Sequence, residues 1–214
     1  MSPIDIIILP SYKGSTLRGG FGYAFKRVVC AIRDKECIDC LLKEKCVYSY
    51  VFETPPPSDT KIMRKYTSAP HPFVIEPPME KRRGYKTGDE IRFGLTLIGR
   101  AIDYLPYFIY TFDELGRIGI GKGKAKYELK TVKSVKMLDD SVKAYETIYD
   151  SDAKTLKSFA IQFLSQPSLS YLSLSSRHSY LSLSFLTPTR ILYNGHLTLD
   201  LEFHILIRNL LRRL

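Results

Sequence analysis

Two segments of helical periodicity, flanked by short strand-like segments, constrain the fold of this chain more than any other feature. Apolar residues recur at helical spacing over about residues 17–31, and residues 101–115 are apolar and aromatic enough for a buried helix. The expected strands are residues 4–9, 73–75, 90–98, 125–137 and 142–149. This order, β-α-β-β-α-β plus one strand, predicts an α+β fold with a ferredoxin-like (RRM-like) domain over residues 1–150, in which two helices pack on one face of an antiparallel sheet.

The remaining residues, 151–214, predict the start of a second ferredoxin-like unit. The sequence SYLSLS at residues 170–175 recurs at residues 179–184, and its alternating Leu and Ser are typical of half-buried strands. A further strand is expected at residues 197–203, followed by an amphipathic helix from Phe203 onwards. A complete second unit would need roughly another 70–100 residues, so we expect this domain to be incomplete.

The chain carries an excess of positive charge, with 32 Lys and Arg against 22 Asp and Glu and a net charge of +10. This balance favours a polyanionic partner, either nucleic acid or an anionic membrane surface, although the charge could serve solubility alone. No apolar run approaches the ~20 residues that span a bilayer, and the N-terminus lacks the basic region of a signal peptide. We therefore expect a cytoplasmic protein.

The positive charge concentrates in a glycine-rich segment. Between Gly116 and Lys136 lie seven basic residues and one acid, Glu128: the basic residues are Arg117, Lys122, Lys124, Lys126, Lys130, Lys133 and Lys136. Glycine lets backbone N–H groups approach a phosphate, and lysines add counterion-releasing contacts. The expected contacts to nucleic-acid phosphates are Gly119, Gly121, Lys122, Gly123, Lys124 and Lys126, together with Arg18 and Arg190. The segment lacks the Gly-Lys-Ser/Thr ending of a Walker motif, and the alternative is a flexible, solvated connector.

All four cysteines lie within 17 residues. Cys30, Cys37, Cys40 and Cys46 follow the pattern C-x6-C-x2-C-x5-C, which predicts a metal-knuckle insertion at residues 30–46. Four thiolates would complete the tetrahedral shell of a structural Zn2+, and an iron–sulfur cluster fits the same spacing. The alternatives are two disulfides or four reduced thiols; disulfides are disfavoured without a secretion signal.

The four histidines, His71, His178, His196 and His204, are dispersed and share no metal-ligand spacing. Neither a G-x-S-x-G elbow nor an H-E-x-x-H motif is present. These features argue against a conventional hydrolase.

Several motifs, taken in order along the chain, resemble one family of RNA-processing proteins. They are residues 17–22 (LRGGFG), the cysteine cluster running into 46–48 (CVY) and 51–53 (VFE), 70–75 (PHPFVI), 97–102 (LIGRAI), 105–108 (LPYF), the loop at 115–123, and 185–190 (FLTPTR) ahead of the helix at 210–214. Together they are similar to the CRISPR-associated precursor-crRNA-processing endoribonucleases of the RAMP superfamily, in their cysteine-bearing branch. The resemblance covers residues 1–214.

The resemblance implies tandem ferredoxin-like domains that bind CRISPR repeat RNA and cut it without a catalytic metal. A ribose 2′-hydroxyl attacks the adjacent phosphate, leaving a 2′,3′-cyclic phosphate and a 5′-hydroxyl, and this needs a general base and donors for the phosphorane. Family members often place a histidine near the first helix. Because this chain has none there, the candidate catalytic residues are Tyr23, Lys26 and His71. Family members also continue to a C-terminal glycine-rich loop, so the resemblance predicts a truncated chain.

Two alternatives stay open. One is a non-catalytic RNA-binding protein of the RAMP superfamily, and the other is a metal-stapled scaffold that contacts other protein subunits, with its basic face incidental. The resemblance implies CRISPR repeat RNA and other CRISPR effector subunits as partners. No membrane partner is expected.

Overall fold

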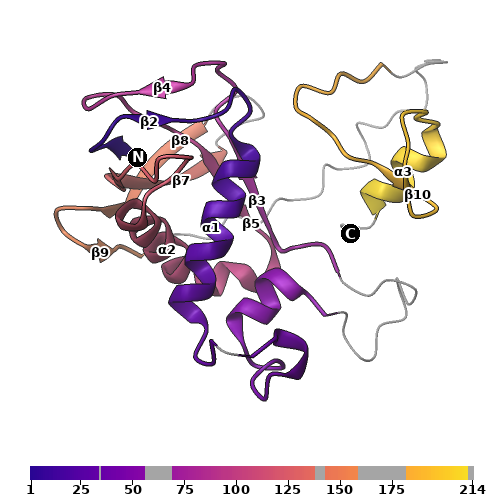
Figure 1. Cartoon of the computed structure of the whole chain (residues 1–214), viewed down its shortest axis with the longest axis horizontal. Coiled ribbons are helices and arrows are strands. Elements are labelled where there is room, and N and C mark those ends of the chain that lie inside the picture. The colour runs from indigo at the N-terminus through magenta and orange to yellow at the C-terminus, as the bar shows by residue number, and fades with distance from the viewer. Residues whose placement is uncertain (34, 56–68, 138–142, 159–181, 212–214) are drawn as a thin grey trace.

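The computed structural model describes residues 1–33, 35–55, 69–137, 143–158 and 182–211, and the structural statements below concern these residues. The helices are Gly14–Val29 (α1), Leu105–Ile118 (α2) and Phe203–Leu211 (α3). The strands are Ser2–Pro3 (β1), Ile7–Ile8 (β2), Phe73–Glu76 (β3), Gly84–Tyr85 (β4), Gly94–Leu97 (β5), Tyr127–Glu128 (β6), Thr131–Met137 (β7), Lys143–Asp150 (β8), Thr155–Leu156 (β9), Leu192–Tyr193 (β10) and His196–Leu197 (β11). The predicted α+β class is confirmed, because small antiparallel sheets are combined with helices (Figure 1).

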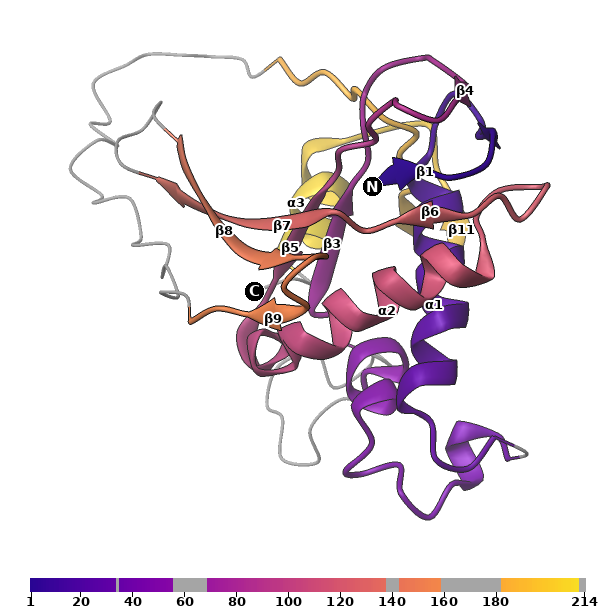
Figure 2. The same cartoon turned by 90° about the vertical axis from the view of Figure 1, so that its left-hand side faces the viewer.

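Four strand segments between residues 1 and 128 follow the order expected for a ferredoxin-like unit. β1 pairs antiparallel with β6, and Figure 2 shows the two side by side. Met1, just before β1, exchanges two backbone hydrogen bonds of 2.9 Å with Ile91. β5, which follows Ile91, pairs antiparallel with β3. The strand segments therefore lie side by side in the order β6, β1, the 91–97 segment and β3.

Several predicted elements are shorter or displaced in the structure. The strand expected at 125–137 is split into β6 and β7, because the chain breaks its pairing between them and Ala125 belongs to a turn. The helix expected from residue 101 begins as a 3-10 helix at Gly99–Tyr104 and becomes α2 only at Leu105. Pro106 stands in the first turn of α2, where a helix needs no N–H donor.

The hydrophobic core lies where α1 and α2 pack together, and it is centred on Phe21. The Phe21 ring stacks on Phe108 at 5.1 Å and on Phe112 at 4.8 Å between ring centres. A Cβ on Gly20 would lie 3.3 Å from Leu115 of α2, so the glycine permits the close approach of the two helices. The core thereby fixes how α1 is oriented and which of its faces is exposed.

The C-terminal segment is described only from residue 182. The final helix predicted from Phe203 is confirmed as α3, whereas the strand expected at 197–203 is wrong except at its first residue, which ends β11. Residues 170–175 and the first part of the second SYLSLS copy lie outside the described residues. The second ferredoxin-like unit therefore stays a prediction. Within the described residues, no helix has both the length and the apolar character needed to cross a membrane.

Candidate nucleic-acid interface

The exposed face of α1 carries one cation, Arg27, and no acid. The helix buries Leu17, Phe21, Ala24 and Phe25 against the core. Its remaining surface includes Ser15, Gly19, Tyr23 and Arg27, four residues apart and therefore in one row along the helix. The sequence of α1, GSTLRGGFGYAFKRVV, contains three basic residues and neither Asp nor Glu. An anion that approaches this face meets no carboxylate of the helix itself.

The glycine-rich segment after α2 forms a turn that backbone hydrogen bonds close. Ile120 and Ala125 exchange two backbone hydrogen bonds, of 2.9 and 3.0 Å, and the N–H of Lys124 donates to the carbonyl of Gly121 at 3.1 Å. A Cβ on Gly119, where φ is +95°, would lie 1.9 Å from the carbonyl oxygen of Lys124. The turn therefore requires glycine at this position.

The same turn packs against β2 through Gly121. A Cβ on Gly121, where φ is +76°, would lie 2.7 Å from the carbonyl oxygen of Ile8. Gly123 has no neighbour within 4 Å of its Cβ position. Two of the three glycines expected to contact phosphate are thus needed for the fold of the turn, and Gly123 is open to an incoming ligand.

A pocket of about 780 Å3 lies between α1 and this turn. Its floor is apolar and includes Leu9, Leu115 and Ile120. Its glycine and polar lining residues are Ser15, Thr16, Gly19, Gly20, Tyr23, Arg83, Gly119, Gly121, Lys122 and Lys124. The fold thus brings the predicted Tyr23 and four predicted residues of the glycine-rich segment to one place, which we call the glycine-turn pocket.

Ion pairs divide the basic residues of the 116–136 segment into two groups. Arg117 pairs with Asp113 and Glu114 at 2.6 and 3.3 Å, Lys130 with Glu128 at 2.7 Å, and Lys136 with Glu146 at 2.9 Å. The side chains of Lys122, Lys124, Lys126 and Lys133 form no ion pair with any acid in the part of the chain that the structure describes. Uncompensated positive charge therefore lies at the pocket and beside it.

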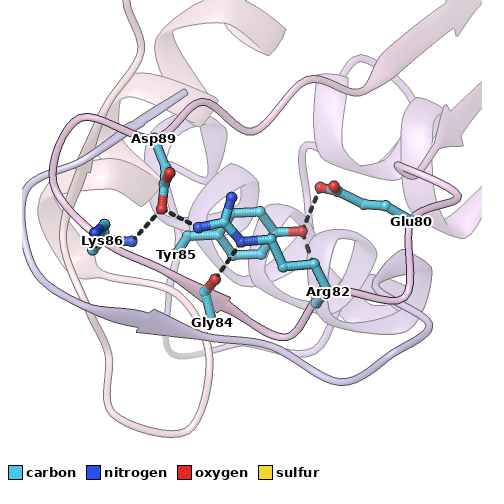
Figure 3. A network of polar contacts seen from close by, with 6 residues as sticks. All are labelled: Glu80, Arg82, Gly84, Tyr85, Lys86 and Asp89. Atoms are coloured by element: carbon cyan, nitrogen blue, oxygen red, sulfur yellow. Dashed lines mark hydrogen bonds and ion pairs between the residues drawn. The ribbon is translucent and has the colours of Figure 1, made fainter.

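Arg83 reaches the pocket from a loop that a buried tyrosine anchors. The hydroxyl of Tyr85 donates a hydrogen bond of 2.6 Å to the carboxylate of Glu80 (Figure 3). Burial, with the neighbouring Glu80, raises the pKa of Tyr85 far above its ordinary value, so the hydroxyl keeps its proton. The ammonium of Lys13 lies 5.9 Å from the centre of the Tyr85 ring, which joins this loop to the start of α1.

The other end of the loop is held by Asp89. Its carboxylate accepts the backbone N–H of Lys86 at 2.7 Å and pairs with the guanidinium of Arg82 (Figure 3). The Lys86 N–H, and after it the Arg82 guanidinium, lowers the pKa of Asp89. The Nε of Arg82 also donates to the carbonyl of Gly84 at 2.7 Å. Both neighbours of Arg83 in the sequence are therefore tied into this network.

The three predicted catalytic residues do not form one cluster. Tyr23 lines the glycine-turn pocket, and its ring centre lies 5.9 Å from the guanidinium of Arg27. Lys26 is directed instead to the ring of Tyr48, with 5.4 Å between its ammonium and the ring centre. His71 lies against Phe73, with 6.1 Å between ring centres. The structure therefore separates Tyr23 from His71.

His71 and Arg18 share one neighbour, the ring of Phe73. The guanidinium of Arg18 lies 4.9 Å from the centre of that ring. The Nδ1 of His71 lies 3.2 Å from the backbone carbonyl oxygen of Val51. Because a carbonyl only accepts, the proton of this contact is on Nδ1. The remaining predicted contact, Arg190, is exposed in the 182–211 segment and does not line the pocket.

Sequence reasoning missed the contributions of Arg83, Ser15 and Thr16 to the pocket. The basic run Lys81-Arg82-Arg83 was a signal for the first of these. The run could have been used, but its place beside the chain that leads into α1 is shown only by three-dimensional contacts, such as the hydrogen bond of 2.8 Å from the Leu9 N–H to the Arg83 carbonyl.

The four cysteines are free, partly exposed thiols on the excursion that follows α1. Burial raises the pKa of Cys37, and the nearby Glu53, Cys30 and Cys46 act in the same direction. Cys37 is thus influenced electrostatically by two of the other three thiols. Within the described residues, however, no three side chains of His, Cys, Asp or Glu stand close enough together to hold a metal ion.

Residues 3–161 match the AF_1859_N family, which is described as an N-terminal domain. The chain belongs to this family. The AF_1859_N region contains α1, the 80–89 loop and the turn, and hence the whole pocket. An uncharacterized protein of Archaeoglobus fulgidus is similar to the chain, with 26% identity over 144 residues, covering 67% of this chain and 45% of the relative. The chain thus spans less than half of that relative's length, and no solved structure matches.

Proposed function

We propose that this AF_1859_N protein binds RNA through the glycine-turn pocket and the adjoining face of α1, and that it processes CRISPR repeat RNA. One observation carries the RNA-binding part: the pocket places Lys122, Lys124 and Arg83 opposite a helix face without acids. Cations without acidic partners can exchange condensed counterions for contacts with phosphates. The ordered motifs at residues 17–22, 70–75 and 97–102 support the CRISPR assignment.

The proposed cleavage is metal-independent and starts from the ribose 2′-hydroxyl. Nε2 of His71 acts as the general base, because the Val51 carbonyl holds the proton on Nδ1. Arg18, beside the same Phe73 ring, supplies positive charge for the phosphorane. The 2′-oxygen bonds to phosphorus and the bond to the 5′-oxygen breaks, which leaves a 2′,3′-cyclic phosphate and a 5′-hydroxyl. Lys26, directed to the Tyr48 ring, and Tyr23, in the glycine-turn pocket, are further donors outside this pair.

The separation of Tyr23 from His71 favours one second candidate, a non-catalytic RNA-binding protein. One experiment distinguishes the two: the full chain is incubated with end-labelled repeat RNA in EDTA, and the products are tested for cyclic phosphate. Cleavage that is lost in His71→Ala supports the endoribonuclease. Salt-sensitive binding without cleavage supports the second candidate. Failure to bind RNA at low salt contradicts both.

The cysteine cluster supports a further proposal, a structural Zn2+ in the 30–46 segment. Cys37 with Cys30 and Cys46 nearby would supply three thiolates and Cys40 the fourth, once the segment draws its thiols together. Metal analysis of the purified protein should give about one equivalent of zinc, and replacing all four cysteines by serine should abolish it. Less than about half an equivalent would contradict the site.

We place the protein's activity in the cytoplasm, with other CRISPR effector subunits as partners.

A further inference from the structure

Gly19 stands in the middle of α1 without a packing reason. Glycine is the least favourable helix-interior residue after proline. Packing contacts explain the other two glycines of α1 in this motif. A Cβ on Gly20 would lie 3.3 Å from Leu115, and one on Gly22 would lie 3.1 Å from Phe52. A Cβ on Gly19 would meet no described atom within 4 Å. Gly19 is thus exposed helix backbone that the fold alone does not require.

This bare backbone lines the glycine-turn pocket together with an aromatic ring and cations. Tyr23, one turn further along α1, is 59% exposed and also lines the pocket. Lys122 and Lys124 line it from the opposing turn. An exposed aromatic ring can stack a nucleobase, even with the Arg27 guanidinium 5.9 Å from its centre, and the two ammonium groups can hold a phosphate. Gly19 lines the same pocket and its Cβ position is empty, so a side chain there would extend into the pocket.

The size and chemistry of the pocket favour an unpaired nucleotide. A volume of about 780 Å3 is within the range of about 300–1,000 Å3 that small-ligand pockets show. In a duplex the bases are stacked on one another and present only their edges, so none could stack on Tyr23. An unpaired nucleotide exposes its base plane and its phosphate together.

We infer that the glycine-turn pocket takes one unpaired nucleotide of the RNA, with its base on Tyr23, its phosphate at Lys122 and Lys124, and its ribose passing over the backbone of Gly19. This inference rests on the proposed RNA-binding function and specifies its substrate as single-stranded at this point.

The test compares two variants of the full chain in the pocket with one matched variant outside it. Tyr110 is 51% exposed on α2 and does not line the pocket, so Tyr110→Ala removes a similar ring from a helix surface. The probe is a fluorescent single-stranded oligoribonucleotide taken from the repeat, and the readouts are its affinity by anisotropy and the thermal unfolding midpoint of each variant.

Gly19→Ala should leave the unfolding midpoint unchanged or raise it, because alanine favours the helix, and yet weaken RNA binding. Tyr23→Ala should weaken binding by about 5- to 150-fold, the effect of losing one stacked base, while Tyr110→Ala binds as the parent protein does. A folded Gly19→Ala or Tyr23→Ala variant that binds as tightly as the parent overturns the inference. So does a parent protein that prefers fully paired RNA. A parent protein that binds no RNA overturns the proposed function itself.

Discussion

The side-chain ammonium of Lys13 donates a hydrogen bond of 2.7 Å to the backbone carbonyl of Glu80, 67 positions along the chain. Lys13 is fully buried, and its ammonium also donates to the carbonyl of Ser11 at 3.2 Å. The bond fastens the start of α1 to the loop that carries Arg83. Two parts of the pocket lining, α1 and the loop with Arg83, are therefore held together by a lysine that does not itself line the pocket.

Replacing this lysine should destabilise the protein. Lys13→Met keeps the aliphatic part of the side chain but leaves the carbonyls of Ser11 and Glu80 without their donor. We expect the free energy of unfolding to fall by about 1–3 kcal/mol, as measured by urea denaturation. Unchanged stability would show that the cost of burying the ammonium cancels its hydrogen bonds.

Asp89 should make stability depend on pH. Its pKa is lowered from an ordinary value of 3.8 by the Lys86 N–H and Arg82. Its stabilisation is therefore complete above that ordinary value and is lost as the pH falls through the lowered pKa. The unfolding midpoint of the parent should exceed that of Asp89→Asn near neutral pH, and the gap should close as the pH falls below the ordinary pKa of an aspartate. Midpoints measured across this range check this, and a gap that persists in acid contradicts it.

The two kinds of glycine in the turn should respond differently to alanine. Gly119→Ala forces a side chain into a positive φ and against the Lys124 carbonyl, and should lower the free energy of unfolding by about 1–3 kcal/mol. Gly123→Ala enters open space and should change it by less than about 0.5 kcal/mol. Denaturant titration of both variants tests the prediction. Equal effects would mean that the turn is not closed as described.

Lysines without an acidic partner should contribute more to RNA binding than lysines that form ion pairs. Two double variants each remove two positive charges: Lys122→Gln with Lys124→Gln, and Lys130→Gln with Lys136→Gln. Only the lysines of the second variant form ion pairs, with Glu128 and Glu146. The first double variant should reduce the slope of log affinity against log salt by roughly 1.4, about 0.7 for each phosphate of a single strand that no longer meets a lysine. The second should leave the slope nearly unchanged. A salt titration of binding gives both slopes, and identical reductions would refute the division.

Local patterns in the sequence were sufficient to predict the order of the main elements. α1, α2 and α3 each show helical periodicity. β5 and β7 fall within predicted strands, and β3 and β8 each extend one residue beyond theirs. The break between β6 and β7 within the predicted strand could not be predicted in the same way. Where β6 ends and β7 begins depends on which partner each segment meets, β1 or β8, and those partners are far apart in the sequence.

The site was predictable in its parts and not in its assembly. The glycine-rich segment and Tyr23 were both identified from sequence, yet their meeting depends on contacts such as Gly121 against Ile8. The ion pair of Lys136 with Glu146 follows from the register of β7 on β8. No spacing rule gives that register. The sequence therefore could not show which lysines have no acidic partner and are available to a ligand.

The closed turn at residues 119–125 has a further consequence for affinity. Its crossing hydrogen bonds and the packing of Gly121 on β2 fix the backbone of Lys122 and Lys124 before any ligand arrives. A ligand then has to immobilise only the outer bonds of the two lysine side chains, and little backbone conformational entropy is lost on binding. The turn is preorganised, so even a short RNA could bind tightly through few contacts.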